Sequence, residues 1–309
     1  MESRSPAEIS RKSKLVNKII KHHFGKAPKS VEFKPAGLTN FVFEAKTAAG
    51  SFIVRIGSSR EKLKDYMKEQ WAITHANNIG VPVAEIVEVG SGIVNSPYMI
   101  QRKVNGNDSL HHPNRREVLR ELGIYTKLIH SIPTNSFGQV FDWSHNRLSR
   151  NKTWRDYLND ELEVVRRMEV LERANVLTPT HFKKLQTSVE RIERWKQQPS
   201  LNHGDIRLKN VITNNKGKIL AIVDWDNCIS SIAPYWDFSI ALHDLSVDAK
   251  QDFLEGYGVP ANEFKSMSYA LKTFNTLNYV PYIERIIERK ESSLLAWYKV
   301  RLNGYLDLT

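Results

Sequence analysis

The sequence of 309 residues contains one cysteine, Cys228, and no run of apolar residues that approaches the length of a membrane span. A single cysteine cannot form an internal disulfide, which is typical of a reducing compartment. A transmembrane helix needs about 18 or more consecutive apolar residues, so we expect no membrane association. The first residues, MESRSPAEISRKSK, lack the apolar segment of a secretory signal. These absences predict a cytoplasmic protein.

Several functional motifs are missing as well. Neither the Walker A sequence of P-loop kinases nor the G-x-S-x-G sequence of α/β-hydrolases occurs, which excludes both classes. The sequence has no zinc-finger spacing, no aromatic RNP-like strand and no dense run of Lys and Arg. We therefore expect no nucleic-acid partner, although the chain is basic.

The net charge of +11 is unevenly distributed. Residues 1–233 hold 37 Lys and Arg against 24 Asp and Glu, whereas residues 234–309 hold 8 against 10. A basic N-terminal portion can attract any polyanion, including the phosphates of a nucleotide. Scattered surface charge is the simpler explanation of the same excess.

Apolar periodicity divides the chain into a strand-rich part followed by a helical part. The first part is predicted to hold helices at 12–24 and 60–78, a hairpin at 41–57, and strands at 84–89 and 97–103. From residue 114 onward helices dominate, and Thr178-Pro179 marks the start of one of them. Strands followed by helices predict an α+β protein. We place an N-terminal lobe at residues 1–103 and a C-terminal lobe at residues 104–309.

The segment HGDIRLKN at residues 203–210, followed by Asp224, carries the groups that phosphoryl transfer requires. One carboxylate must accept the proton of the attacking hydroxyl, and further oxygen ligands must hold the metal that bridges the nucleotide phosphates. Asp205 and Asn210 lie five residues apart on one loop, and an antiparallel hairpin would return Asp224 beside Asn210. The alternative is a polar loop at a hairpin entrance, in which Asp205 only caps backbone amides.

HGDIRLKN together with IVDWDN at residues 222–227 resembles the signature of the aminoglycoside phosphotransferase and choline kinase-like enzymes, which share the two-lobed protein-kinase fold. The resemblance implies that Asp205 is the catalytic base and that Asn210 and Asp224 bind Mg²⁺. Further similar stretches are LIHSIP at 128–133, PYWDF at 234–238, whose Asp braces the catalytic loop in that family, and TWRDY at 153–157, which resembles the hygromycin B phosphotransferase branch.

The resemblance also implies a nucleotide site in the N-terminal lobe. A kinase fold has a basic residue on its third strand that grips the phosphates and pairs with a glutamate on the next helix. Arg55 occupies the corresponding position, at the end of the predicted third strand. Glu69 is its best partner, with Asp65 and Glu61 as alternatives. Arg keeps its charge and binds bidentately, so it can replace the usual Lys. A simple surface ion pair is the other interpretation.

The remaining nucleotide contacts are expected around two short segments. Gly37 and Thr39 stand where the phosphate flap of the fold would lie, although the segment has one glycine and no G-x-G-x-x-G run. Gln101 and Lys103 belong to the segment that would line the nucleotide cleft. The expected donor is ATP or GTP.

The acceptor site is expected over the C-terminal helices. A cationic aminoglycoside needs carboxylates, and we name Asp226, Glu284 and Asp156 as candidates. Further acidic candidates are Asp160, Glu161 and Glu288. The predicted function is a monomeric kinase that moves the terminal nucleotide phosphate to a hydroxyl of an aminoglycoside-type antibiotic. A metabolic kinase acting on a sugar, choline or an amino-acid-like alcohol is the alternative, and a non-catalytic nucleotide-binding protein is a third.

Overall fold

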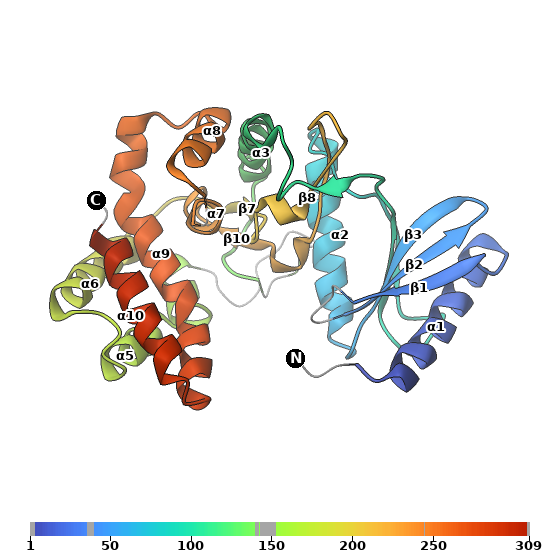
Figure 1. Ribbon diagram of the computed structural model, residues 1–309, viewed down its shortest axis with the longest axis horizontal. Coiled ribbons are helices and arrows are strands. Elements are labelled where there is room, and N and C mark those ends of the chain that lie inside the picture. Colours follow the sequence, from blue (N-terminus) through green and yellow to red (C-terminus); the bar gives the residue numbers. More distant parts are fainter. Residues whose placement is uncertain (1–3, 36–39, 140–141, 143–152, 244, 308–309) are drawn as a thin grey trace. The chain divides into compact units, whose positions relative to one another are not determined.

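The structure is a computed structural model that describes residues 4–35, 40–139, 142, 153–243 and 245–307 (Figure 1). Internal contacts divide the chain into two units. Unit 1 comprises residues 1–113 and 209–226, and unit 2 comprises residues 114–208 and 227–309. The segment 209–226 therefore belongs to unit 1 although it follows most of unit 2 in sequence. The lobe boundary at residues 103 and 104 stays a prediction.

Unit 1 is built around a five-stranded antiparallel sheet in the order β1-β2-β3-β5-β4. A smaller antiparallel sheet has the order β6-β8-β9. The helices and strands of unit 1 are α1 (Pro6–Phe24), β1 (Ser30–Lys34), β2 (Phe41–Thr47), β3 (Gly50–Ile56), α2 (Lys62–Asn78), β4 (Ile86–Gly90), β5 (Tyr98–Arg102), β6 (Asn107–Asp108), β8 (Val211–Thr213) and β9 (Ile219–Ile222).

Helix α1 covers one face of the large sheet (Figure 1). Successive strand side chains point to opposite faces, so Phe43 and Val54 share one of them. Both are buried in one apolar cluster with Ile19 and Ile20 of α1. Arg55, the next residue after Val54, points to the other face.

Unit 2 is mainly helical and contains one short antiparallel pair of strands, β7 with β10. Its helices and strands are α3 (Arg115–His130), α4 (Trp154–Asp160), α5 (Val164–Arg173), α6 (Pro179–Glu193), β7 (Ser200–Asn202), β10 (Ile229–Ser231), α7 (Tyr235–Ala241), α8 (Val247–Tyr257), α9 (Ala261–Glu288) and α10 (Ser292–Asp307). Helix α6 begins as predicted, because Thr178 Oγ1 accepts the His181 N–H at 3.2 Å and Pro179 occupies the first turn.

The prediction of an α+β protein with a strand-rich N-terminal part and a helical C-terminal part is confirmed. The predicted hairpin at 41–57 corresponds to β2 and β3, whose residues pair from Phe41 with Ile56 to Thr47 with Gly50. Among the described residues, no helix combines the length and the apolar character that a membrane span requires.

Helices α3 and α8 approach closely because each presents a glycine at the contact. A Cβ atom on Gly256 of α8 would lie 1.9 Å from the Arg120 carbonyl oxygen of α3. A Cβ atom on Gly123 of α3 would lie 2.2 Å from the Phe253 carbonyl oxygen of α8. Both obstacles are backbone atoms, which cannot move aside as a flexible side chain would.

We therefore expect Gly256→Ala to lower the free energy of unfolding by about 2 kcal/mol, because overpacking outweighs the helix-forming gain of alanine. Gly304→Ala is the matched control, since no atom lies within 4 Å of the added Cβ in α10. That variant should be stabilised by up to about 1 kcal/mol. Urea unfolding of both variants measures the difference, and equal stabilities would contradict the close contact.

Candidate active site

The loop that follows β7 is anchored by a buried carboxylate from α7. Asp237 is fully buried. Its Oδ2 accepts the main-chain N–H of His203 at 2.8 Å, and its Oδ1 accepts that of Gly204 at 2.7 Å. The two residues before Asp205 are thus fixed by hydrogen bonds to a charged acceptor, which are stronger than those between neutral groups.

A second side chain supports the same carboxylate. His130 Nε2 lies 3.0 Å from Asp237 Oδ2, and His130 Nδ1 lies 3.0 Å from the Tyr257 hydroxyl. Because a carboxylate only accepts, Nε2–H of His130 donates to Asp237, and Nδ1 forms the hydrogen bond with the Tyr257 hydroxyl. Burial acts to raise the pKa of Asp237, but His130, together with His203 and the Gly204 N–H, outweighs it and lowers that pKa.

Gly204 is required by the loop itself. Its φ of +83° lies in the left-handed region, and a Cβ atom there would be 2.0 Å from the Asn227 carbonyl oxygen. A side chain at this position would therefore be strained by conformation and would also collide with the backbone. The glycine of the HGD sequence lets the loop pass this carbonyl.

Asp205 is buried, with 8% of its surface exposed. Its Oδ1 accepts from Nε of Arg207 at 2.8 Å, and the Arg207 side chain is 43% exposed. The guanidinium therefore orients the Asp205 carboxylate from the solvent side. Sequence reasoning assigned no role to Arg207, although a basic residue two positions after the predicted base was a usable signal.

The second part of the motif lies in unit 1. Val211 pairs with Ile222 in the β8–β9 hairpin, and the Val223 N–H donates to the Asn210 carbonyl oxygen at 2.9 Å. The hairpin thus brings Asp224 back beside Asn210, as the sequence predicted. Asp224 has a φ of +68°, a conformation that aspartate tolerates better than most residues. Both side chains offer oxygen donors, which fit a hard cation such as Mg²⁺.

Arg55 and Glu69 form a buried ion pair. Arg55 Nη1 lies 2.5 Å from Glu69 Oε2, and the Glu69 side chain is 1% exposed. Burial acts to lower the pKa of Arg55, but the Glu69 carboxylate outweighs it and raises that pKa, so the guanidinium stays charged. Asp65, one of the alternatives, pairs with Lys62 at 2.8 Å. The geometric part of the prediction, Glu69 as the partner of Arg55, is confirmed.

Helix α2 connects this ion pair to the hairpin. Lys68, the neighbour of Glu69, donates from Nζ to the Asp226 carbonyl oxygen at 3.0 Å. The Asp226 carboxylate also acts on Arg55 and favours its charged form. The predicted phosphate-binding pair and the residue two positions after Asp224 therefore belong to one network inside unit 1. Sequence reasoning missed Lys68, because helical spacing does not reveal a contact with residue 226.

Four further residues were predicted to bind the nucleotide, and the structure describes two of them. Gln101 pairs with Ile53 in the sheet, so it lies on the same face as Arg55. Lys103 Nζ binds Glu44 Oε1 at 2.8 Å. Gly37 and Thr39 lie outside the described residues.

The predicted acceptor carboxylates are separated from one another. Asp226 lies in unit 1, in the network just described. Asp156 closes a capping box at the start of α4, where its Oδ2 accepts the Thr153 N–H at 3.1 Å and its own N–H donates to Thr153 Oγ1. That role fixes the start of α4 and occupies one carboxylate oxygen.

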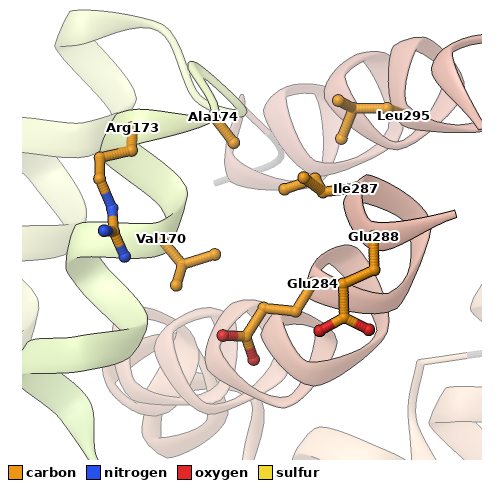
Figure 2. A pocket seen from close by; sticks show the side chains of 7 residues that line it. All are labelled: Val170, Arg173, Ala174, Glu284, Ile287, Glu288 and Leu295. Carbon is orange, nitrogen blue, oxygen red and sulfur yellow. The ribbon is translucent and has the colours of Figure 1, made fainter. Parts of the chain in front are cut away.

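Glu284 lines a cavity of about 370 Å³ in unit 2. Figure 2 shows Glu284 and Glu288 projecting from α9 and Arg173 from α5, with an apolar wall between them. Glu284 also forms an ion pair with Arg166. The structure thus brings two of the predicted acidic candidates, Glu284 and Glu288, to one cavity.

Comparison with known proteins supplies a family. The sequence model of the phosphotransferase enzyme family matches residues 30–266. Among curated proteins, none matches the chain in sequence.

Solved structures of two aminoglycoside phosphotransferases resemble the chain. The apo form of a thermostable mutant of APH(4)-Ia is 17% identical, with 94% of this chain and 98% of that chain covered and a TM-score of 0.67. A ternary complex of such a mutant with AMP-PNP and hygromycin B is 16% identical, with 94% and 97% covered and the same TM-score of 0.67. The complex of APH(2″)-IIIa with GDP and kanamycin is 15% identical, with 94% and 98% covered, also at 0.67. These likenesses confirm the predicted protein-kinase-like fold.

The anchoring role of Asp237 predicts a pH-dependent stability. We expect Asp237→Asn to lower the free energy of unfolding by about 3 kcal/mol at pH 7, because buried donors lose their charged acceptor. The pKa of Asp237 is lower in the folded chain than its unfolded value near 3.8. Its contribution to the free energy of unfolding is therefore complete above pH 3.8, and it is lost as the pH falls through the lower pKa of the folded chain. The difference between wild type and variant should therefore shrink as pH falls below about 4.

Urea unfolding between pH 7 and the lowest pH at which the wild type stays folded measures this. Asp248→Asn, at an exposed position of α8, is the control and should change stability by less than about 0.5 kcal/mol. A deficit in Asp237→Asn that does not change with pH would argue against a charged Asp237.

Proposed function

Because the chain belongs to the phosphotransferase enzyme family, we propose that it transfers the terminal phosphate of ATP or GTP to a hydroxyl group of an aminoglycoside-type antibiotic. The protein is a phosphotransferase with an alcohol group as acceptor. The observation that carries the finer proposal is the HGD loop. Its main chain is fixed by Asp237, and its Asp205 carboxylate is oriented by Arg207.

In the proposed reaction, Asp205 acts as the general base. The acceptor hydroxyl oxygen forms a bond with the terminal phosphorus, and the bond between that phosphorus and the bridging oxygen breaks, which releases the nucleoside diphosphate. The hydroxyl proton passes to a carboxylate oxygen of Asp205. Arg207 keeps the carboxylate in one orientation while the proton moves, which avoids reorganisation at the moment of reaction.

Asn210 and Asp224 are proposed to hold Mg²⁺. The support for this is the hairpin that sets them side by side and the oxygen chemistry of both side chains. When bound, the cation would offset the negative charge of the nucleotide phosphates.

The nucleotide is proposed to bind on the sheet face that α1 leaves open. That face carries Arg55 and Gln101, and Glu69 keeps the Arg55 guanidinium in place. A buried, oriented guanidinium binds phosphate oxygens with little further loss of side-chain entropy. Lys103, Gly37 and Thr39 are the further proposed contacts. Complexes of structural relatives contain AMP-PNP in one case and GDP in another, so both donors stay in the proposal.

The acceptor is proposed to be a polycation, as in the relatives solved with hygromycin B and with kanamycin. Asp226, Glu284 and Asp156 are the proposed contacts. Each exposed ion pair contributes only about 0.2–1 kcal/mol, so several carboxylates must act together. The chain's net charge of +11 opposes a polycation at long range, and binding therefore depends on locally acidic surface.

The role of Asp205 gives a direct kinetic prediction. We expect Asp205→Asn to lower kcat by about 10²–10⁴-fold, because an amide cannot accept the hydroxyl proton. Nucleotide affinity should stay nearly unchanged, since the amide keeps the size of the carboxylate. Asp248→Asn serves as the matched control and should retain full activity. Full activity of Asp205→Asn would remove Asp205 from the mechanism.

The acceptor class is tested by measuring release of ADP or GDP from the purified protein with Mg²⁺ and a panel of alcohols. We expect turnover with at least one of hygromycin B, kanamycin and gentamicin. Because several exposed ion pairs are required, KM should rise as salt is added. A susceptible bacterium that expresses the protein should then tolerate the same antibiotic.

Choline and common sugars form the other half of the panel. Turnover of one of these compounds, with none of the three antibiotics accepted, would replace the antibiotic kinase with the metabolic kinase. An inactive protein against the whole panel, while it still binds nucleotide, would favour a non-catalytic nucleotide-binding protein.

A further inference from the structure

Helix α2 carries a buried lysine to which the proposed function assigns no role. Lys68 is 6% exposed, and its Nζ donates to the Asp226 carbonyl oxygen at 3.0 Å. Removing an ammonium group from water is unfavourable unless hydrogen bonds compensate for the lost hydration. A buried lysine is therefore an unusual residue for this position. The carbonyl that it binds lies two residues after Asp224, a proposed ligand of Mg²⁺.

Helix α2 is fixed to the large sheet by contacts that do not involve Lys68. The helix packs against β4 and β5 (Figure 1). The buried Tyr66 donates its hydroxyl to Asn40 Oδ1, directly before β2, at 3.0 Å. The Tyr66 ring centre lies 5.1 Å from the guanidinium carbon of Arg55, whose Nη1 donates to Glu69 Oε2. Because these contacts set the position of the helix, Lys68 projects from a rigid support.

The segment that accepts the hydrogen bond has an uncommon backbone conformation. Asp224 has a φ of +68°, in the left-handed region, and a conformation of this kind persists where the surrounding structure holds it. Before Asp224, the Val223 N–H donates to the Asn210 carbonyl oxygen at 2.9 Å. After Asp224, Lys68 holds the Asp226 carbonyl oxygen. Asp224 thus lies between two hydrogen bonds, one made beside the hairpin and one made by α2.

Lys68 relates this segment to the proposed phosphate-binding pair. Trp225 is buried, and its Nε1 donates to the Ile222 carbonyl oxygen at 2.9 Å, which holds the segment to β9. Lys68 connects the same segment to the helix whose next residue, Glu69, binds Arg55. A proposed Mg²⁺ ligand and a proposed phosphate-binding residue are therefore linked through one turn of α2.

We propose that Lys68 is a positioning residue for the metal site, which holds the segment 224–226 at a fixed position relative to Arg55. The inference rests on the proposed function, since it takes Asn210 and Asp224 as the ligands of Mg²⁺. Lys68 acts through the main chain of Asp226 and does not need to touch the nucleotide or the cation. Removing a group that supports metal ligands in this way typically lowers metal affinity by about 10–100-fold.

The gain in nucleotide affinity that Mg²⁺ provides tests this role. Isothermal titration of the full chain with AMP-PNP, once with saturating Mg²⁺ and once with EDTA, measures the two dissociation constants. We expect Lys68→Met to reduce their ratio by about tenfold, because α2 no longer holds the segment that carries Asp224. The affinity in EDTA should stay nearly unchanged, since Arg55 and Glu69 are intact.

Further variants separate positioning from a general loss of structure. Lys64→Met makes the same substitution at an exposed position of α2 and should keep the full gain from Mg²⁺. Lys68→Arg keeps a charged N–H donor, so its gain should stay within about threefold of the wild-type gain. If Lys68→Met does not fold, Lys68→Gln, which is polar but shorter than lysine and uncharged, should show the same tenfold loss.

Two results would overturn the role of Lys68 alone. One is a full gain from Mg²⁺ in folded Lys68→Met or Lys68→Gln. The other is an equal loss of AMP-PNP affinity with Mg²⁺ and with EDTA, which would assign Lys68 to nucleotide binding or to general stability. A wild-type chain that binds AMP-PNP no better with Mg²⁺ than with EDTA would instead reject the proposed metal site, and the inference with it.

Discussion

A buried carboxylate is costly unless donors surround it, and Asp237 is the point in unit 2 where that constraint organises the chain. Its oxygens accept from His130 and from the main chain of His203 and Gly204. Since α3 contributes one donor and the HGD loop two, the loop cannot shift without removing two of the hydrogen bonds that stabilise this buried charge. The orientation of Asp205 follows from this, because it is the next residue along a fixed backbone.

In unit 1, the cost of burying a charge is offset by a second buried charge of opposite sign. Arg55 and Glu69 are both buried, and a pair of this kind stabilises little, because desolvation offsets most of the attraction. What the pair provides is position: the guanidinium stays charged and faces the side of the sheet that α1 does not cover. A charged group held in this way favours an anionic ligand over water, which suits a nucleotide phosphate.

The sequence predicts local and periodic features well. Strand alternation gave the β2–β3 hairpin, the Thr178-Pro179 pair gave the start of α6, and the spacing from Asn210 to Asp224 gave a returning hairpin. The sequence did not predict contacts between segments that lie far apart along the chain. The hydrogen bond from Lys68 to residue 226 and the ion pair of Glu284 with Arg166 depend on tertiary packing, which no periodicity encodes. Asp156 shows the same limit, since acidic character alone did not reveal its role in helix capping.

The division of the chain into units has a consequence for biosynthesis. Residues 209–226 belong to unit 1, yet the ribosome makes them only after residues 114–208 of unit 2. Until then β6 lacks its partner β8, and Val83 lacks its bridge to Ile222. Unit 1 is therefore completed late, and a nascent chain that stops before residue 211 leaves the edge of β6 unpaired, an exposed edge of the kind that promotes aggregation. For the same reason no single cut in the chain separates the two units.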